Sequence, residues 1–274
     1  MNMHRTCLLL LLFIISSLLT PFSMEGKKKD KILKYLKISE NMDTLLSYTG
    51  TSTKIDLSQY PELDSIKVIG KSAFESNKSL TEIILPPHTK EIGQDAFIYC
   101  NNLTTVIIPD SLEKIGAGAF WECSSLRLDH LPTLLKVIDD NAFVGCSKIT
   151  LTEIPENVRE IGIRALSYCD SLKSVTLPPN LKVIPAMLFF RCPNLTNVNI
   201  PDTVTKIGYN AFYGCDSLKE LRLPSGECVL EGNPFKKSPN LKKIYISSST
   251  TAVGVNGWSG KEMVDLDSDI FQRY

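Results

Sequence analysis

The fold is decided by the stretch IGQDAFIYC at residues 92–100, because the same pattern returns 23 residues later as IGAGAFWEC at residues 115–123. When the chain is aligned on Phe74, this unit repeats without insertion or deletion. The phenylalanine column holds Phe74, Phe97, Phe120, Phe143, Leu166, Phe189, Phe212 and Phe235. A fixed period between about 20 and 50 residues indicates a repeat architecture, and 23 lies in the leucine-rich-repeat range. The repeat therefore predicts an extended stack of coils with a large surface.

Each unit carries the same local signals, and residues 92–109 serve as the example. The Ile-Gly pair turns the chain inward, where glycine permits a positive φ or a close backbone approach. Ala96-Phe97 is expected in a short helical turn, and a strand follows that Pro109 ends. Stacked copies place the parallel strands on a concave side and the short helical turns on a convex side. We therefore expect an α/β solenoid with an array of eight repeats over residues 66–246.

The composition limits the kinds of partner. The chain of 274 residues has 30 basic and 30 acidic side chains, so its formal net charge is zero. A non-specific nucleic-acid binder would show a basic excess or a basic stripe. No nucleic-acid partner is therefore expected, whereas a protein partner is compatible with this balance.

Residues 1–23 have the character of a targeting segment. Arg5 precedes an apolar run from Cys7 to Leu19, which is short for a transmembrane helix and suits the core of a signal peptide. No clear small-x-small cleavage site follows, and the lysines at 27–29 disfavour export of what comes after them. We expect a cleaved signal peptide and a secreted, periplasmic or cell-surface protein. The alternative is a protein tethered to the membrane by the uncleaved segment.

Six of the eight cysteines share one column of the repeat, three residues after the phenylalanine position. This column holds Cys100, Cys123, Cys146, Cys169, Cys192 and Cys215. Neighbouring coils stand about 4.8 Å apart, whereas the Cβ atoms of a disulfide lie about 3.8 Å apart, so parallel side chains would have to move to bond. The column therefore predicts small buried thiols. Cys228 lies outside it and is predicted to be the most reactive free thiol.

The two ends of the array need caps, because an end coil exposes apolar surface and strand edges. Residues 24–65 are assigned to an N-terminal cap, and the loosely helical spacing of apolar residues over 31–48 predicts a short amphipathic helix within it. A first, degenerate strand is expected at Ile55 to Leu57. Residues 247–274 are assigned to a C-terminal cap and tail.

One repeat carries a family resemblance. The unit IGYNAFYGCDSL at residues 207–218, preceded by Ile200-Pro201, resembles the BspA-like, or treponema-type, leucine-rich repeat. The resemblance implies a right-handed arc or horseshoe, often secreted or at the surface of bacteria and some protozoa. It also implies binding or adhesion rather than catalysis. The departures from the family pattern are Leu166 for phenylalanine, and Asp139 and Pro185 for glycine.

Side chains that point out from the concave sheet are not needed by the core, so the binding prediction rests on them. An apolar patch is expected in the N-terminal half of this face, and such a patch usually marks a contact site. Polar side chains are expected in the C-terminal half. The predicted ligand-binding residues are Ile84, Ile107, Leu128, His130, Leu151, Glu153, Arg222, Lys243 and Tyr245.

A second register stays open in the middle of this face. Leu128 and Leu151 are each followed by a polar residue, Asp129 and Thr152, at a position expected to face the core. A local bulge or register flip would turn the leucines inward and the polar groups outward, and the patch would be lost. Either register breaks the pattern of the third and fourth repeats.

The function expected from these features is binding. No nucleotide-binding glycine loop or nucleophile elbow is visible, and the chain has only three histidines, so no enzyme, cofactor or metal site is expected. We expect an adhesion-type interaction protein that binds a protein or another macromolecule through the concave face. A monomer is expected, with a dimer through the apolar patch as the alternative. The alternative function is a structural or tethering module of the cell envelope without a dedicated ligand.

Overall fold

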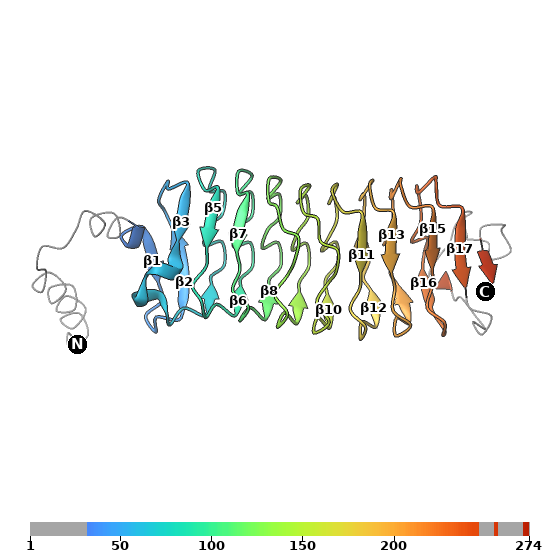
Figure 1. Cartoon of the computed structure of the whole chain (residues 1–274), viewed down its shortest axis with the longest axis horizontal. Helices are drawn as coiled ribbons and strands as arrows, with labels where there is room; N and C mark the ends of the chain where they lie inside the picture. Colours follow the sequence, from blue (N-terminus) through green and yellow to red (C-terminus); the bar gives the residue numbers. More distant parts are fainter. Residues whose placement is uncertain (1–31, 247–254, 257–270, 274) are drawn as a thin grey trace, which may run out of the picture.

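Each 23-residue unit forms one coil, and the coils stack along the long axis of the molecule, with β1 near one end of the stack and β17 near the other (Figure 1). The computed structural model describes residues 32–246, 255–256 and 271–273. The predicted signal segment, residues 1–23, lies outside the described residues. The solenoid confirms the predicted fold class.

A first row of parallel strands, here called the long-strand face, follows the predicted strand of each repeat. Its strands pair in register at the repeat period, so that Val106 lies opposite Ile83. The strands are β3 (Lys54–Asp56), β5 (Glu82–Ile84), β7 (Thr105–Ile107), β11 (Ser174–Thr176), β13 (Asn197–Asn199), β15 (Glu220–Arg222), β17 (Lys243–Ile246) and β19 (Phe271–Arg273). The first of them confirms the degenerate strand predicted around Ile55.

A second row, the short-strand face, forms where only an inward turn was expected. Its strands are β4 (Val68–Ile69), β6 (Glu91–Ile92), β8 (Lys114–Ile115), β9 (Val137–Ile138), β10 (Glu160–Ile161), β12 (Val183–Ile184), β14 (Lys206–Ile207), β16 (Val229–Glu231) and β18 (Val255–Asn256). The glycine that follows the isoleucine in β4, β6, β8, β10 and β14 allows neighbouring coils to approach closely, whereas Asp139 and Pro185 take this position after β9 and β12. The Gly93 N–H donates to the Ile69 carbonyl at 2.7 Å, and a Cβ on Gly93 would lie only 2.8 Å from that oxygen.

The helical turn expected around the phenylalanine column is replaced by a third inter-coil ladder. We call the segment from two residues before to two residues after each column position the turn edge. Alternate amides bond within the coil and to the next coil: Ala96 N–H donates to Gly93 at 3.3 Å, and Phe97 N–H donates to Ala119 at 2.8 Å. In an α-helix each amide instead donates to the carbonyl four residues earlier in the same helix. The turn edge instead has left-handed residues at both ends, as at Asp95 with φ 55°.

Stacked phenylalanines form the centre of the core. The rings of Phe97 and Phe120 have centroids 5.3 Å apart and planes 2° from parallel. Leu166 separates the stack that ends at Phe143 from the one that begins at Phe189. Full burial of a phenylalanine side chain contributes about 1.5–3 kcal/mol. Since Leu166 is also fully buried between the two stacks, the apolar core is continuous along the array.

The cysteine column hydrogen-bonds to this core. Cys123 Sγ lies 3.1 Å from the carbonyl oxygen of Phe97, in the coil before it. The same contact recurs at the other five column cysteines. In the last repeat Ser238 takes the position, and its Oγ lies 2.7 Å from the Phe212 oxygen. A small donor at this position therefore gives a buried carbonyl a second hydrogen bond, beside the one from its own coil, as from the Cys100 N–H to the Phe97 oxygen at 3.0 Å.

All seven cysteines in the described part of the chain are buried free thiols, which confirms the predicted thiol column. The prediction that Cys228 is reactive is wrong. Its side chain is 1 % exposed, and burial raises the pKa of its thiol to about 11. Since the thiolate is the reactive form, Cys228 is protected like the column cysteines.

The N-terminal cap is a hairpin. β1 (Leu36–Ile38) pairs antiparallel with β2 (Thr44–Tyr48), and β2 then pairs with β4 to begin the short-strand face. The amphipathic helix predicted over 31–48 is therefore wrong for residues 36–48; only Ile32 and Leu33 are helical. Leu45 is buried and Leu46 is 39 % exposed, which is the alternation of a strand. Two short 3-10 turns, η1 (Leu57–Gln59) and η2 (Pro61–Leu63), lead from β3 into the array.

At the C-terminal end the chain adds to both rows. β18 pairs with β16, and β19 pairs with β17, both in parallel. The strands therefore continue beyond residue 246, where the array was expected to end. The assignment of residues 247–274 to a cap stays a prediction, because most of them lie outside the described residues.

Pro185 interrupts the short-strand face. It stands where most other repeats have glycine, and that glycine donates its N–H to the coil before, as Gly162 does to Ile138 at 2.7 Å. Proline has no N–H to donate. β10 and β12 accordingly belong to different sheets, and the bond returns one coil later from Gly208 to Ile184 at 2.8 Å.

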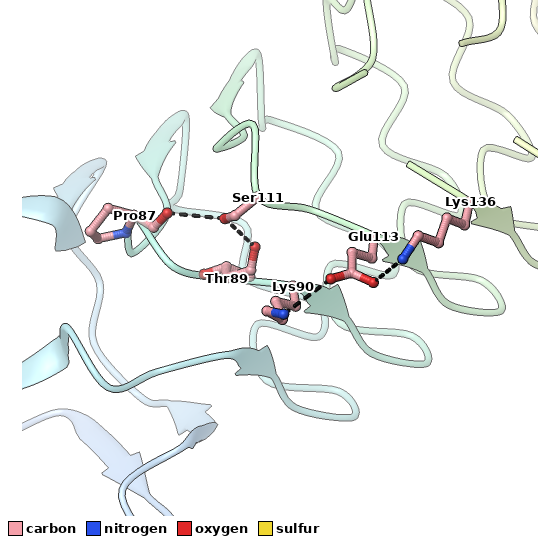
Figure 2. A network of polar contacts seen from close by, with 6 residues as sticks. All are labelled: Pro87, Thr89, Lys90, Ser111, Glu113 and Lys136. Carbon is pink, nitrogen blue, oxygen red and sulfur yellow. Dashed lines mark hydrogen bonds and ion pairs between the residues drawn. The ribbon is translucent and has the colours of Figure 1, made fainter. Parts of the chain in front are cut away.

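Polar side chains add further links between coils. Glu113 lies between two lysines of the neighbouring coils, 3.1 Å from Lys90 and 2.5 Å from Lys136 (Figure 2). Ser111 Oγ lies 2.8 Å from the Thr89 carbonyl oxygen in the coil before it. These contacts hold the segment that leads into each short strand.

Candidate ligand-binding face

The middle of the long-strand face, between β7 and β11, differs from the other repeats. Leu128 is 8 % exposed and Leu151 is 1 % exposed, whereas the Asp129 and His130 side chains are 77 % and 85 % exposed. The Thr150 N–H donates to the Leu128 oxygen at 2.9 Å, one residue further along than in the regular repeats. This is the register flip that the sequence left open.

Leu128 and Leu151 were predicted as exposed ligand contacts, and that prediction is wrong. Burial of a leucine contributes about 1.5–3 kcal/mol, whereas an unpaired buried carboxylate such as that of Asp129 costs far more. The chain therefore turns the leucines inward at the expense of the strand. Of the apolar patch only Ile107, 50 % exposed, and the half-buried Ile84 remain, so the alternative of a dimer through this patch loses its basis.

His130 and Glu153 lie on the surface, but each has a local partner. His130 Nδ1 is 2.6 Å from Asp129 Oδ1, and this contact holds the pKa of the Asp129 carboxyl below its usual value. Glu153 is exposed and its backbone forms an isolated bridge with Thr176. In the part of the chain that the structure describes, no three His, Cys, Asp or Glu side chains gather closely enough to hold a metal ion.

The polar half of the long-strand face contains a hollow of about 700 Å³. It lies where β13 ends one sheet and β15 begins the next. Val198 and Leu221 are buried and form its floor. The side chains that alternate with them along the strands point outward. They are Thr176, Asn197, Asn199, Glu220, Arg222 and Tyr245.

Two of the predicted residues, Arg222 and Tyr245, meet at this hollow. They lie opposite each other in the register of β15 and β17, as do Glu220 and Lys243. The Tyr245 hydroxyl lies 3.3 Å from the Glu220 carboxylate, which links the two strands. Lys243 is exposed on β17, beside the hollow.

The sequence placed the other lining residues in outward columns without recognising them as a site. The signal was the strand Asn197-Val198-Asn199, which has an amide at both outward positions. Asparagine is depleted in strands, so its presence on two free positions of β13 is unusual for a purely structural strand. Asn197 Nδ2 also lies 3.3 Å from Ser174 Oγ on β11, so the amides join a polar surface that spans several coils.

Exposed lysines lie at the N-terminal ends of strands that carry this hollow, whose own lining has one cation, Arg222. One exposed lysine stands directly before each of β11, β15 and β17, at Lys173, Lys219 and Lys242. Together with Arg222 and Lys243 they make five cations, against the carboxylates of Glu220 in the lining and of Glu153, which is exposed beside Thr176. The arrangement can accept and donate hydrogen bonds and favours a ligand surface with acidic groups.

The comparisons with known proteins agree with this architecture. The model of the BspA type leucine rich repeat region matches residues 28–127 and 136–264 in six copies, and the chain belongs to this family. A leucine rich repeat protein from T. pallidum is 31 % identical, with a TM-score of 0.61 over 68 % of this chain and 88 % of that one. One from Bacteroides ovatus is 25 % identical, with a TM-score of 0.52 over 80 % and 74 %. The search of curated proteins found no match.

Membership in this family confirms the resemblance seen in the repeat at residues 207–218. It suggests a protein-interaction module, and no catalytic family is indicated. Among the residues described, no helix is long and apolar enough to cross a membrane.

Proposed function

We propose that this protein is a secreted or surface-exposed, non-enzymatic interaction module that binds a folded protein through the polar half of its long-strand face. The observation that carries the proposal is the hollow between β13 and β15, whose outward side chains serve no role in the core. The predicted signal segment and the family support exposure outside the cell.

Arg222 and Tyr245 are the expected anchors. Arginine and tyrosine are enriched among residues that dominate binding energy, and such residues cluster at the centre of an interface. Here they lie opposite each other on adjacent strands, with the amides of Asn197 and Asn199 on the other side of the hollow. A surface loop of the partner with acidic side chains fits this setting, because the lysines around the hollow attract negative charge.

The test is a comparison of matched double variants. A partner is captured on native cells by crosslinking to the full chain, and the purified partner is then titrated with wild type, with Arg222→Ala/Tyr245→Ala and with Arg159→Ala/Tyr209→Ala. The control removes an exposed arginine and an exposed tyrosine from other surfaces. We expect the first variant to bind at least about tenfold more weakly and the control to bind like wild type. Equal binding by all three proteins contradicts the site.

Location is tested separately by fractionation of native cells and N-terminal sequencing of the recovered protein. We expect a new N-terminus near residues 23–26 in the extracellular or periplasmic fraction. An intact Met1 in the membrane fraction would instead support the tethered form.

A further inference from the structure

The turn edge carries two adjoining hollows that are separate from the long-strand face. The first, about 490 Å³, is lined by Trp121 and Tyr168, and the second, about 360 Å³, is lined by Tyr168 and Tyr213. Tyr168 and Asp170 line both. The two hollows therefore form one trough, here called the turn-edge trough, from Trp121 in the third repeat to Lys237 in the eighth.

Glycines open the trough. The position two residues after the phenylalanine column carries a side chain in most coils, but it is Gly145 in the fourth and Gly214 in the seventh. Both have a positive φ, 74° and 67°. A Cβ on Gly145 would lie 2.7 Å from Glu122 Oε1, so a side chain there would have to displace the Glu122 carboxylate. The glycines leave the space that the aromatic residues flank.

Aromatic rings give the trough its apolar surfaces. Phe190 stacks on Tyr213 with centroids 4.6 Å apart and planes 13° from parallel. Tyr168 meets Phe190 edge to face at 5.5 Å. All three rings, and Trp121, are only half-buried. Tyrosine and tryptophan combine an apolar ring with a polar tip, which suits partners that have both kinds of surface.

The charges along the trough balance. The three carboxylates stand against three cations, and both kinds occur in each hollow. They are Glu122, Asp170 and Asp216, and Arg164, Arg191 and Lys237. Nucleic acids and other polyanions are bound in grooves with a clear excess of positive charge. The balance therefore favours a neutral ligand.

The backbone of the trough is already hydrogen-bonded from coil to coil. The amides of Glu122, Gly145, Tyr168 and Arg191 donate to carbonyls of the next coil at 2.7, 3.0, 2.9 and 2.6 Å. A peptide that docks as an added strand needs free main-chain groups at a sheet edge. The trough offers side chains in place of such an edge, which disfavours an extended peptide.

We propose that the turn-edge trough binds a neutral glycan in extended form. A sugar ring has an apolar C–H face that packs on an aromatic ring, and hydroxyl groups that donate to carboxylates and accept from guanidinium groups. Because the coils recur about every 4.8 Å, similar groups recur along the trough, and a polymer of like units meets them repeatedly. This site is independent of the protein partner proposed for the long-strand face.

The probes are neutral hexasaccharides of three linkage types, cellohexaose, maltohexaose and N-acetylated chitohexaose, titrated into the full chain by calorimetry. We expect at least one to bind with a Kd on the order of 1 mM or below. Tyr168→Ala should weaken this binding about tenfold, because it removes the ring shared by both hollows. Tyr168→Phe keeps the ring and should bind within about twofold of wild type.

Tyr209→Ala is the matched control, since Tyr209 is 42 % exposed and lies outside both hollows. Asp170→Asn/Asp216→Asn is the second test, because it changes two exposed carboxylates without opening the core. It should weaken binding at least about fivefold. The proposal is overturned if no hexasaccharide binds up to about 10 mM, or if Tyr209→Ala weakens binding as much as Tyr168→Ala. Binding of heparin or a proline-rich peptide alone would assign the trough to a different class of ligand.

Discussion

The Sγ atom of Cys146 lies 3.0 Å from the carbonyl oxygen of Phe120, which stands 26 residues earlier in the chain. Both groups are fully buried. The thiol is therefore a second donor to this core carbonyl, which also accepts from the Cys123 N–H at 3.0 Å. The six column cysteines are connectors between coils rather than reactive groups.

Two replacements of Cys146 distinguish the contribution of its hydrogen bond to stability from the contribution of its side-chain volume. Cys146→Ala removes one of the two donors to the Phe120 carbonyl and should lower the free energy of unfolding in urea by about 0.5–1.5 kcal/mol. Cys146→Ser keeps a donor, as Ser238 does naturally, and should be the more stable of the two variants. An alanine variant as stable as the serine variant would show that the contact contributes nothing.

The buried thiols predict a loss of stability at alkaline pH. Burial raises the pKa of Cys228 from 9.0 to about 11 and that of Cys215 to about 12. The folded state binds the proton more tightly, so this contribution is complete below pH 9 and is lost as the pH rises through the folded pKa. Between pH 8 and 10 wild type should lose about 1 kcal/mol more than Cys228→Ala. Equal pH dependence in urea titrations would contradict the burial of this thiol.

The phenylalanine stack predicts a large cavity effect in mid-array. Phe143 is fully buried against Phe120, with centroids 5.4 Å apart, so Phe143→Ala should cost about 3–5 kcal/mol of unfolding free energy. Phe190→Ala is the control, because Phe190 is half-buried and should cost less. A loss below about 1 kcal/mol for Phe143→Ala would contradict the stacked core.

Glu113 predicts an acid-sensitive link between coils. The ammonium groups of Lys136 and Lys90 hold the pKa of its carboxyl below the usual 4.5, so the link stabilises the fold above that pH and is lost as the pH falls through the lowered pKa. Glu113→Gln should lower the melting temperature slightly at pH 7 and leave it unchanged near pH 3. Added salt should reduce the effect at pH 7. Glu156→Gln, an exposed glutamate, serves as the control.

Pro185→Gly should repair the short-strand face. The substitution supplies a backbone N–H at position 185. In neighbouring coils the equivalent glycine donates this N–H to the isoleucine carbonyl of the preceding coil, which here is that of Ile161. The amide introduced at position 185 should therefore exchange slowly with deuterium, as that of Gly162 is expected to do. Fast exchange at position 185 would show that the break between β10 and β12 has another cause.

The sequence was sufficient to predict the stack, the strands of the long-strand face and the buried thiol column. Each follows from one residue type that recurs every 23 residues, such as Phe97 and Cys100 in one unit. The prediction of a helical turn at the turn edge failed because the amides there bond to residues 22 positions away in the next coil, as Phe97 does to Ala119. A local pattern of apolar residues gives no information about hydrogen bonds to another coil. The N-terminal hairpin was missed because a few apolar residues, such as Leu45, fit both the 3.6-residue period of a helix and the two-residue period of a strand.

The candidate site was predictable only in part. Outward columns identified Arg222 and Tyr245, since their positions follow from the strand register. The sequence left the register at Leu128 open, because the apolar residue and the acid occupy adjacent positions and only packing decides between them. The hollow itself lies at the break between β13 and β15, and residues 217–222 keep the regular pattern there. The asparagines at 197 and 199 indicate a polar surface, but the local sequence does not predict the break.

The inter-coil hydrogen bonds of the turn edge have a consequence for how such a chain can change length. Each bond joins residues 22 positions apart, as from Tyr168 to Phe190, and passes from coil to coil without a break through the seven units from Ser76 to Gly214. Duplication or loss of one whole unit of 23 residues in a gene would leave every remaining donor facing an equivalent acceptor. Recombination can therefore lengthen or shorten the surface available to partners while the hydrogen bonds between the remaining coils stay the same.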